Sequence, residues 1–270
     1  MTPQARQLHD FLAASPGLAL VEISEAKGST PREVATWMLV SPTGIFGTIG
    51  GGQLEFMAVA RAREMIAQRI GTAKLDVPLG PEIGQCCGGR VTIDLALVDD
   101  ELRQTIPARI AVEEETQPNV FLFGGGHVGH ALANALSLLP LTTTLVETRP
   151  EELEGVPEGI RTIGTAVPEE VVRDARPDSA FVVLTHDHSL DFLIVAEALA
   201  RGDAAYVGMI GSKTKKATFR SWYLREAGGT EERFSRLICP IGGTEVKDKR
   251  PAVIAALVTA ELLRYLPSRG

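Results

Sequence analysis

The sequence predicts an α/β protein, with a doubly wound parallel sheet in the C-terminal part and a smaller α+β domain before it. From residue 119 onward, short apolar runs alternate with segments of helical periodicity, as in a parallel sheet with right-handed helical crossovers. The apolar runs lack polar alternation, which is typical of strands buried on both faces. Residues before 110 instead contain a hairpin signal and an alternating strand. We therefore expect two domains, 1–110 and 111–270.

The N-terminal domain is expected to begin with a helix over 4–14 and a strand over 18–26. Two short apolar runs on either side of Pro42-Thr43-Gly44 predict a hairpin, and residues 53–70 have helical spacing. Residues 90–98 alternate like a strand. The charged, proline-bearing stretch 99–119 is interpreted as a linker with room for a helical turn.

The C-terminal domain is expected to contain four buried strands and four helices. The strands are predicted at 120–124, 142–147, 181–185 and 204–211, and the helices at 127–139, 189–202, 212–228 and 250–266. Ser212 is the expected N-cap of the third helix, and Pro251 is the expected first residue of the fourth. The basic run Lys213 to Lys216 is interpreted as a solvated helix start.

Composition excludes several classes of function. The 270 residues are 44% hydrophobic and 23% charged, with a net charge of -7, which argues against a nucleic-acid surface. No apolar stretch is long enough for a membrane span. The first residues show no secretory signal, and the chain has three cysteines, so we expect a cytoplasmic protein.

A glycine loop is the strongest functional signal. Gly124, Gly126 and Gly129 form G-x-G-x-x-G between a predicted strand and a predicted helix, the context of a Rossmann-like, phosphate-binding turn. The helix N-terminus favours an anion. Glu147 ends the next strand, where an acid commonly binds ribose hydroxyls. The alternative is a Rossmann-like fold that has lost its ligand.

Other polar residues are candidates with open alternatives. His127, inside the loop, is either a ligand contact or a solvent-facing residue, and Arg149 is either a phosphate partner or part of a plain loop. His186 and His188 follow a strand at the carboxyl edge of the sheet, where ligands bind. A metal is not favoured there, because further ligands at zinc spacing are missing. Cys239 is interpreted as a small buried hydrophobe.

The N-terminal domain has its own glycine turn and an adjacent cysteine pair. Gly50 and Gly51 precede a helix and form either a second anion-binding turn or a flexible hairpin exit. Cys86 and Cys87 are too close for an unstrained disulfide and lack zinc-ligand spacing. They remain either a presented thiol or a buried turn.

These segments together resemble the XdhC/CoxI family of accessory proteins for molybdenum hydroxylases. The resemblance rests on "GSTPRE", "GTIGGGQLE", "LGPEIGQCCGGRV", "FGGGHVGHALA", "VETRPEE", "LTHDHSLD", "YVGMIGSKTK" and "CPIGG…RPAVIAALVTAEL", which run in family order over nearly the whole chain. The xanthine dehydrogenase branch is the more similar one. Gln53 stands where the CoxI branch usually has cysteine, so a sulfur role is excluded at that position, and Cys87 aligns with the more widespread cysteine of the family.

The resemblance implies a non-enzymatic chaperone that binds the molybdenum cofactor, protects it during sulfuration and inserts it into apo xanthine dehydrogenase. A cysteine desulfurase and a molybdenum cofactor donor would be further partners, and a homodimer is left open. The implied cofactor-binding residues are Gly50, Gly51, Gln53, Gly124, Gly126, His127, Gly129, Glu147, Arg149, His186 and His188, with Cys86 or Cys87 near molybdenum or its sulfur. No residue receives a catalytic role. The alternative is an NAD(P)-dependent oxidoreductase with His186 or His188 as acid or base.

Overall fold

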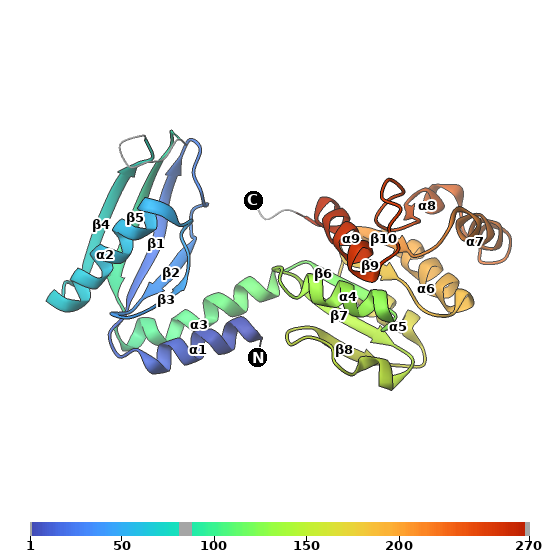
Figure 1. The fold of residues 1–270 in the computed structure, drawn as a ribbon, viewed down its shortest axis with the longest axis horizontal. Coiled ribbons are helices and arrows are strands. Elements are labelled where there is room, and N and C mark those ends of the chain that lie inside the picture. The colour runs from blue at the N-terminus through green and yellow to red at the C-terminus, as the bar shows by residue number, and fades with distance from the viewer. Residues whose placement is uncertain (1, 81–87, 268–270) are drawn as a thin grey trace. The chain divides into compact units, whose positions relative to one another are not determined.

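The computed structural model describes residues 2–80 and 88–267. The chain divides into two compact units, Met1–Val112 and Glu113–Gly270 (Figure 1). One holds an antiparallel sheet and the other a parallel sheet, each with its own helices. The predicted α/β class, with a Rossmann-like C-terminal sheet and an α+β N-terminal part, is confirmed. Within the described residues, no helix has the length and apolar character to cross a bilayer.

The N-terminal unit is a five-stranded sheet in the order β3-β2-β1-β5-β4. Its elements are α1 (Pro3–Ala14), β1 (Ala19–Lys27), β2 (Trp37–Val40), β3 (Ile45–Gly47), α2 (Gly52–Gln68), β4 (Thr72–Pro78), β5 (Arg90–Leu97) and α3 (Asp100–Glu115). The predicted hairpin is confirmed, since Val40 of β2 pairs with Ile45 of β3. Alternate residues such as Val21 and Ile93 pack with Met65 of α2, so α2 covers one face of the sheet. Leu20 on the other face packs with α1 and α3.

The linker predicted for 99–119 is wrong, because most of it forms α3. Asp99 accepts a hydrogen bond from the Leu102 N–H at 2.8 Å and so supports the start of the helix. Ile106 and Ile110, one turn apart, are buried against the sheet. Pro107 lies between them inside the helix. Because of this proline and the surrounding charges, the narrow apolar stripe does not give a clear helical pattern in the sequence.

The C-terminal unit is a six-stranded parallel sheet in the order β11-β10-β9-β6-β7-β8. Its elements are β6 (Asn119–Phe123), α4 (His127–Leu136), β7 (Thr142–Glu147), the 3-10 turn η2 (Pro150–Leu153), β8 (Arg161–Gly164), α5 (Pro168–Asp174), β9 (Ala180–Val183), α6 (His188–Arg201), β10 (Tyr206–Met209), α7 (Lys213–Arg225), α8 (Glu231–Ser235), β11 (Leu237–Ile238) and α9 (Pro251–Tyr265). The strand order reverses between β6 and β9. Ligands of open α/β sheets bind at the carboxyl ends of the strands beside such a reversal.

Candidate functional site at the carboxyl edge of the parallel sheet

The loops after β6 and β9 meet where the strand order reverses. Gly124 has a φ of +122°, and a Cβ at this position would lie 2.5 Å from the Leu184 carbonyl oxygen and 3.0 Å from the Cα of Thr185. The chain leaving β6 therefore touches the chain leaving β9 without space for a side chain. This contact fixes the start of the glycine loop.

The other glycines of the motif serve different purposes. A Cβ on Gly129 would lie 2.0 Å from the Gly124 carbonyl oxygen, so Gly129 allows α4 to pack on the loop. Gly126 has an ordinary φ of −70°, and a Cβ there would have no heavy atom of the described residues within 4 Å. The fold thus requires glycine at 124 and 129. At Gly126, the N-cap residue of α4, the described residues leave the Cβ position open.

The N-terminus of α4 offers donors to that space. Gly126 is the N-cap residue and provides no side-chain hydrogen bond, while the first N–H groups of any α-helix lack partners within the helix. These groups and the helix dipole attract an anion. His127 is exposed at the first position of α4. His130, which the sequence did not single out, contacts the Glu152 carbonyl oxygen through Nε2 at 2.9 Å.

Glu147 ends β7 and is buried under the glycine loop, with an exposed fraction of 3%. Its Oε2 accepts the Gly125 N–H at 2.7 Å, and its Oε1 accepts the Thr148 N–H at 2.8 Å and hydroxyl at 3.1 Å. Arg149 donates its backbone N–H, Nε and one terminal nitrogen to the same carboxylate. Burial by itself raises the pKa of Glu147, but these hydrogen bonds, led by Arg149, lower the pKa to about 2.

The guanidinium of Arg149 forms ion pairs with two carboxylates that are close to it in the sequence. Besides Glu147, its guanidinium forms an ion pair with Glu152 at 3.1 Å. Glu152 follows in the 3-10 turn after β7, and its carbonyl oxygen would lie 2.6 Å from a Cβ on Gly125. In this arrangement Arg149 ties the two acids to the glycine loop.

The segment after β9 presents two exposed histidines, His186 and His188. Asp187 between them is the N-cap of α6 and accepts the Ser189 N–H at 2.7 Å. In the described part of the chain, no three His, Cys, Asp or Glu side chains are grouped as metal ligands. The two histidines therefore flank a helix cap at the carboxyl edge of the sheet.

The burial of Lys215 shows that the expectation of a solvated helix start over 213–216 is wrong at this residue. Its side chain is 9% exposed and forms an ion pair with Asp191 of α6, which is completely buried. Lys215 also donates to the Ile210 carbonyl oxygen at 3.0 Å. Asp191 in turn accepts the N–H and hydroxyl of Thr185, at 3.0 and 2.7 Å. The pair thus holds the segment that Gly124 touches, while Lys213 is exposed as expected.

The last strand brings Cys239 to the same edge. It is 8% exposed, and burial raises the pKa of its thiol against the opposing effect of Lys216 and Lys215. The following turn is held by Glu261 of α9, which accepts the Gly242 N–H at 3.1 Å and the Tyr206 hydroxyl at 2.6 Å. The expected small buried role of Cys239 agrees with this position.

Gly50, Gly51 and Gln53, predicted from the sequence, lie at one end of the N-terminal sheet. The N–H groups of Ile49 and Gly51 donate to Oε2 of Glu55, at 3.1 and 3.2 Å, so the acid of "GGGQLE" occupies this turn. A Cβ on Gly50 would lie 2.9 Å from Pro31, which joins the turn to the "GSTPRE" loop. Gln53 is exposed in the first turn of α2.

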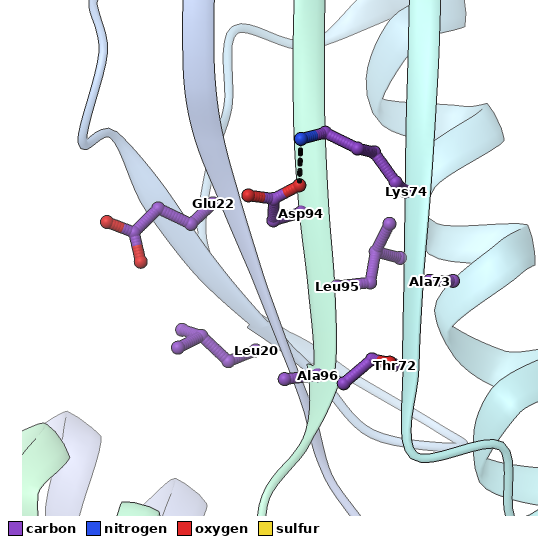
Figure 2. A pocket seen from close by; sticks show the side chains of 8 residues that line it. All are labelled: Leu20, Glu22, Thr72, Ala73, Lys74, Asp94, Leu95 and Ala96. Atoms are coloured by element: carbon purple, nitrogen blue, oxygen red, sulfur yellow. Dashed lines mark ion pairs between the residues drawn. The ribbon is translucent and has the colours of Figure 1, made fainter.

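Gly88 and Gly89, the two glycines of "CCGG", lie at the same end of that sheet. A Cβ on Gly89 would lie 2.2 Å from the Ser29 carbonyl oxygen, and Gly88 forms a bridge with Ser29. Three separate motifs therefore converge here. Cys86 and Cys87 themselves lie outside the described residues, as does the rest of 81–87. A hollow on the sheet face, drawn in Figure 2, contains none of the predicted site residues.

Two family models match the chain. Residues 120–262 match the model described as the XdhC Rossmann domain, and residues 12–75 match the model described as the XdhC and CoxI family.

One relative and one solved structure extend this comparison. The protein YqeB of Escherichia coli (strain K12) is 26% identical over 256 residues, which are 91% of this chain and 43% of that protein. This chain thus spans less than half the length of its curated relative. A crystal structure described as a xanthine dehydrogenase from Bacillus halodurans matches with a TM-score of 0.77 and 19% identity, over 98% of this chain and 96% of the other. At that identity the likeness shows a common fold.

Proposed function

Because the chain belongs to the XdhC and CoxI family, we propose that it is an accessory protein that binds the molybdenum cofactor and delivers it to xanthine dehydrogenase. In this role it protects the cofactor while sulfur is added, receives it from a cofactor donor and works beside a cysteine desulfurase in the cytoplasm. The cofactor is cargo, and the protein needs to hold and release it rather than transform it.

The open space at Gly126 is the observation that carries the proposal. The cofactor is a phosphorylated pterin, and its phosphate suits the unpaired N–H groups at the start of α4. Among residues 2–80 and 88–267 no side chain fills this space, since a Cβ at Gly126 would have no heavy atom of these residues within 4 Å. His127 lies beside these N–H groups and is free to contact the phosphate or the pterin edge.

Glu147 argues against the competing role as an NAD(P)-dependent oxidoreductase. An acid in this position usually accepts hydrogen bonds from ribose hydroxyls. A carboxylate has about four lone-pair sites. In this chain the Glu147 carboxylate already accepts hydrogen bonds from the Gly125 N–H and from the N–H and hydroxyl of Thr148. It also accepts hydrogen bonds from three donors of Arg149. A ribose would have to displace part of this network, whereas a terminal phosphate at α4 leaves it intact.

The remaining predicted residues divide between the two units. His186 and His188 stand at the carboxyl edge of the parallel sheet and are proposed to contact the pterin. For Cys86 and Cys87 we propose the soft thiolate contact that molybdenum or its sulfur favours. Glu55 holds the turn at Gly50 and Gly51 by a hydrogen bond. We therefore propose that this turn shapes its end of the N-terminal sheet and does not itself bind the cofactor.

Cofactor content tests the proposal. The full chain, expressed in a host that makes the molybdenum cofactor, should co-purify with molybdenum and with a pterin that becomes fluorescent on oxidation. Gly126→Asp should lose both, because its carboxylate repels a phosphate. The matched control is Gly71→Asp, at an exposed position where a Cβ also contacts nothing. Retention of nicotinamide nucleotide alone, or full pterin content in Gly126→Asp, would overturn the proposal.

A further inference from the structure

Among the residues that the structure describes, none pairs with the outer edge of strand β4. In the described residues it is the last strand of the five-stranded sheet and pairs only with β5, over all seven of its residues. The opposite edge strand, β3, has three residues, and the edge strands of the parallel sheet, β8 and β11, have four and two. A long open edge is a template for another strand.

The direction of the free backbone groups follows from the pairing with β5. The carbonyl oxygen of Gly71 accepts the Leu97 N–H, and the Leu79 N–H donates to Gly89, both at 2.8 Å. Since bonding alternates along an antiparallel strand, odd-numbered residues of β4 bond to β5. Thr72, Lys74 and Asp76 therefore point their N–H groups outward, toward the open edge.

The side chains on this edge are complementary to themselves. Lys74 and Asp76 are two residues apart and so lie on one face of the sheet, with opposite charges. Within the chain Lys74 forms an exposed ion pair with Asp94 at 3.3 Å, drawn in Figure 2, and Asp76 pairs with Arg90. Both side chains are exposed and remain within reach of a neighbouring strand.

We propose that β4 pairs antiparallel with β4 of a second copy of this chain, about a two-fold axis at Leu75. Thr72 then faces Pro78 of the second copy, Lys74 faces Asp76, and each outward N–H of Thr72, Lys74 and Asp76 meets an outward carbonyl. Pro78, which has no N–H, contributes only its carbonyl oxygen. The two five-stranded sheets become one continuous sheet. On both sides of the axis a lysine of one copy faces an aspartate of the other.

Charge selects this register over its neighbours. An axis at Lys74 would place the two lysines opposite each other, and an axis at Asp76 would do the same for the two aspartates. Like charges directly opposite destabilise a strand pair. With the axis at Leu75 both facing pairs are attractive, and the partly buried Leu75 meets its own copy on the face that α2 covers. This inference is independent of the ligand held at α4.

Cross-linking tests the register. In a Cys86→Ala/Cys87→Ala background, Leu75→Cys should form an intermolecular disulfide on mild oxidation, because residues facing each other at the axis are close enough to be bridged. Ala73→Cys is the matched control, since Ala73 faces Val77 of the second copy and should remain uncross-linked. A stronger cross-link in Ala73→Cys than in Leu75→Cys would overturn the proposed register.

Sedimentation of the full chain tests the interface itself. Lys74→Asp should weaken the dimer about tenfold or more, since both facing pairs become repulsive. The charge exchange Lys74→Asp/Asp76→Lys should restore it. Lys74→Pro should abolish pairing while β4 stays bonded to β5, because the N–H it removes points outward. Asp94→Asn, which breaks only the internal pair, should leave the dimer intact. A monomer at every concentration, or a dimer unaffected by Lys74→Pro, would overturn the proposal.

Discussion

Lys215 of α7 forms an ion pair with the fully buried carboxylate of Asp191 on α6, and so fixes α7 to α6. Asp191 also accepts hydrogen bonds from the N–H and the hydroxyl of Thr185. The Cα of Thr185 lies next to Gly124. The side chains of Lys215 and Asp191 are 9% and 0% exposed, so the pair supports the loop after β9 from inside the protein. Its removal should therefore affect stability first.

Lys215→Met should lower the free energy of unfolding by about 3–5 kcal/mol, because it leaves the Asp191 charge buried without its counter-ion. Urea denaturation measures the loss. Lys213→Met on the same turn is exposed and should change stability by less than about 0.5 kcal/mol. The double variant Asp191→Asn/Lys215→Met should lose less than the single one. Equal losses from Lys213→Met and Lys215→Met would contradict the burial of the pair.

Glu147 should make stability fall in acid. Its pKa is lowered from 4.5 to about 2 in the folded chain. A lowered pKa stabilises the fold above the unfolded value, and this contribution is lost as the pH falls from about 4.5 toward 2. It amounts to at most about 3 kcal/mol. The difference in unfolding free energy between wild type and Glu147→Gln should be constant above pH 4.5 and shrink below it. A pH-independent difference would show that the carboxylate is not ionised in this network.

The sequence predicted the parts of the fold whose burial leaves a local pattern. β6, β7, β9 and β10 are the four inner strands of the parallel sheet, and their short, mostly apolar runs predicted them. The edge strand β8 is exposed at every residue, and β11 has two residues, so neither has such a pattern. β4 is absent from the predicted strands although Ala73, Leu75 and Val77 alternate, because the charged residues between them interrupt the apolar run.

The candidate site was predictable where spacing in the sequence is itself the signal. The glycine motif and Glu147 follow from such spacing, but the partners of Glu147 depend on how the loop folds back over β7. Lys215 and Lys213 look alike in the sequence. Only the packing of α7 against α6 distinguishes the buried lysine from the exposed one.

Two glycines of one motif should lose different amounts of stability when replaced by alanine. Gly129→Ala places a Cβ 2.0 Å from the Gly124 carbonyl oxygen, so α4 must shift, at a cost of about 1–3 kcal/mol or more. Gly126→Ala adds a methyl group to open space and should cost less than about 1 kcal/mol. Thermal unfolding of the two variants checks the order. If Gly126→Ala proved the more damaging, the space in front of α4 would not be open.

Cys239 should be inert in the folded chain. Its thiol is 8% exposed and burial raises its pKa, so both access and the thiolate fraction are low. In a Cys86→Ala/Cys87→Ala variant, where Cys239 is the one remaining cysteine, a thiol reagent should react at least about tenfold more slowly in native buffer than in urea. Reaction should follow unfolding, because the thiol becomes accessible when β11 leaves β10. Rapid labelling of the native variant would instead place a reactive thiol at the carboxyl edge of the sheet, beside Lys215 and Lys216, and would make Cys239 a candidate contact for the proposed cofactor.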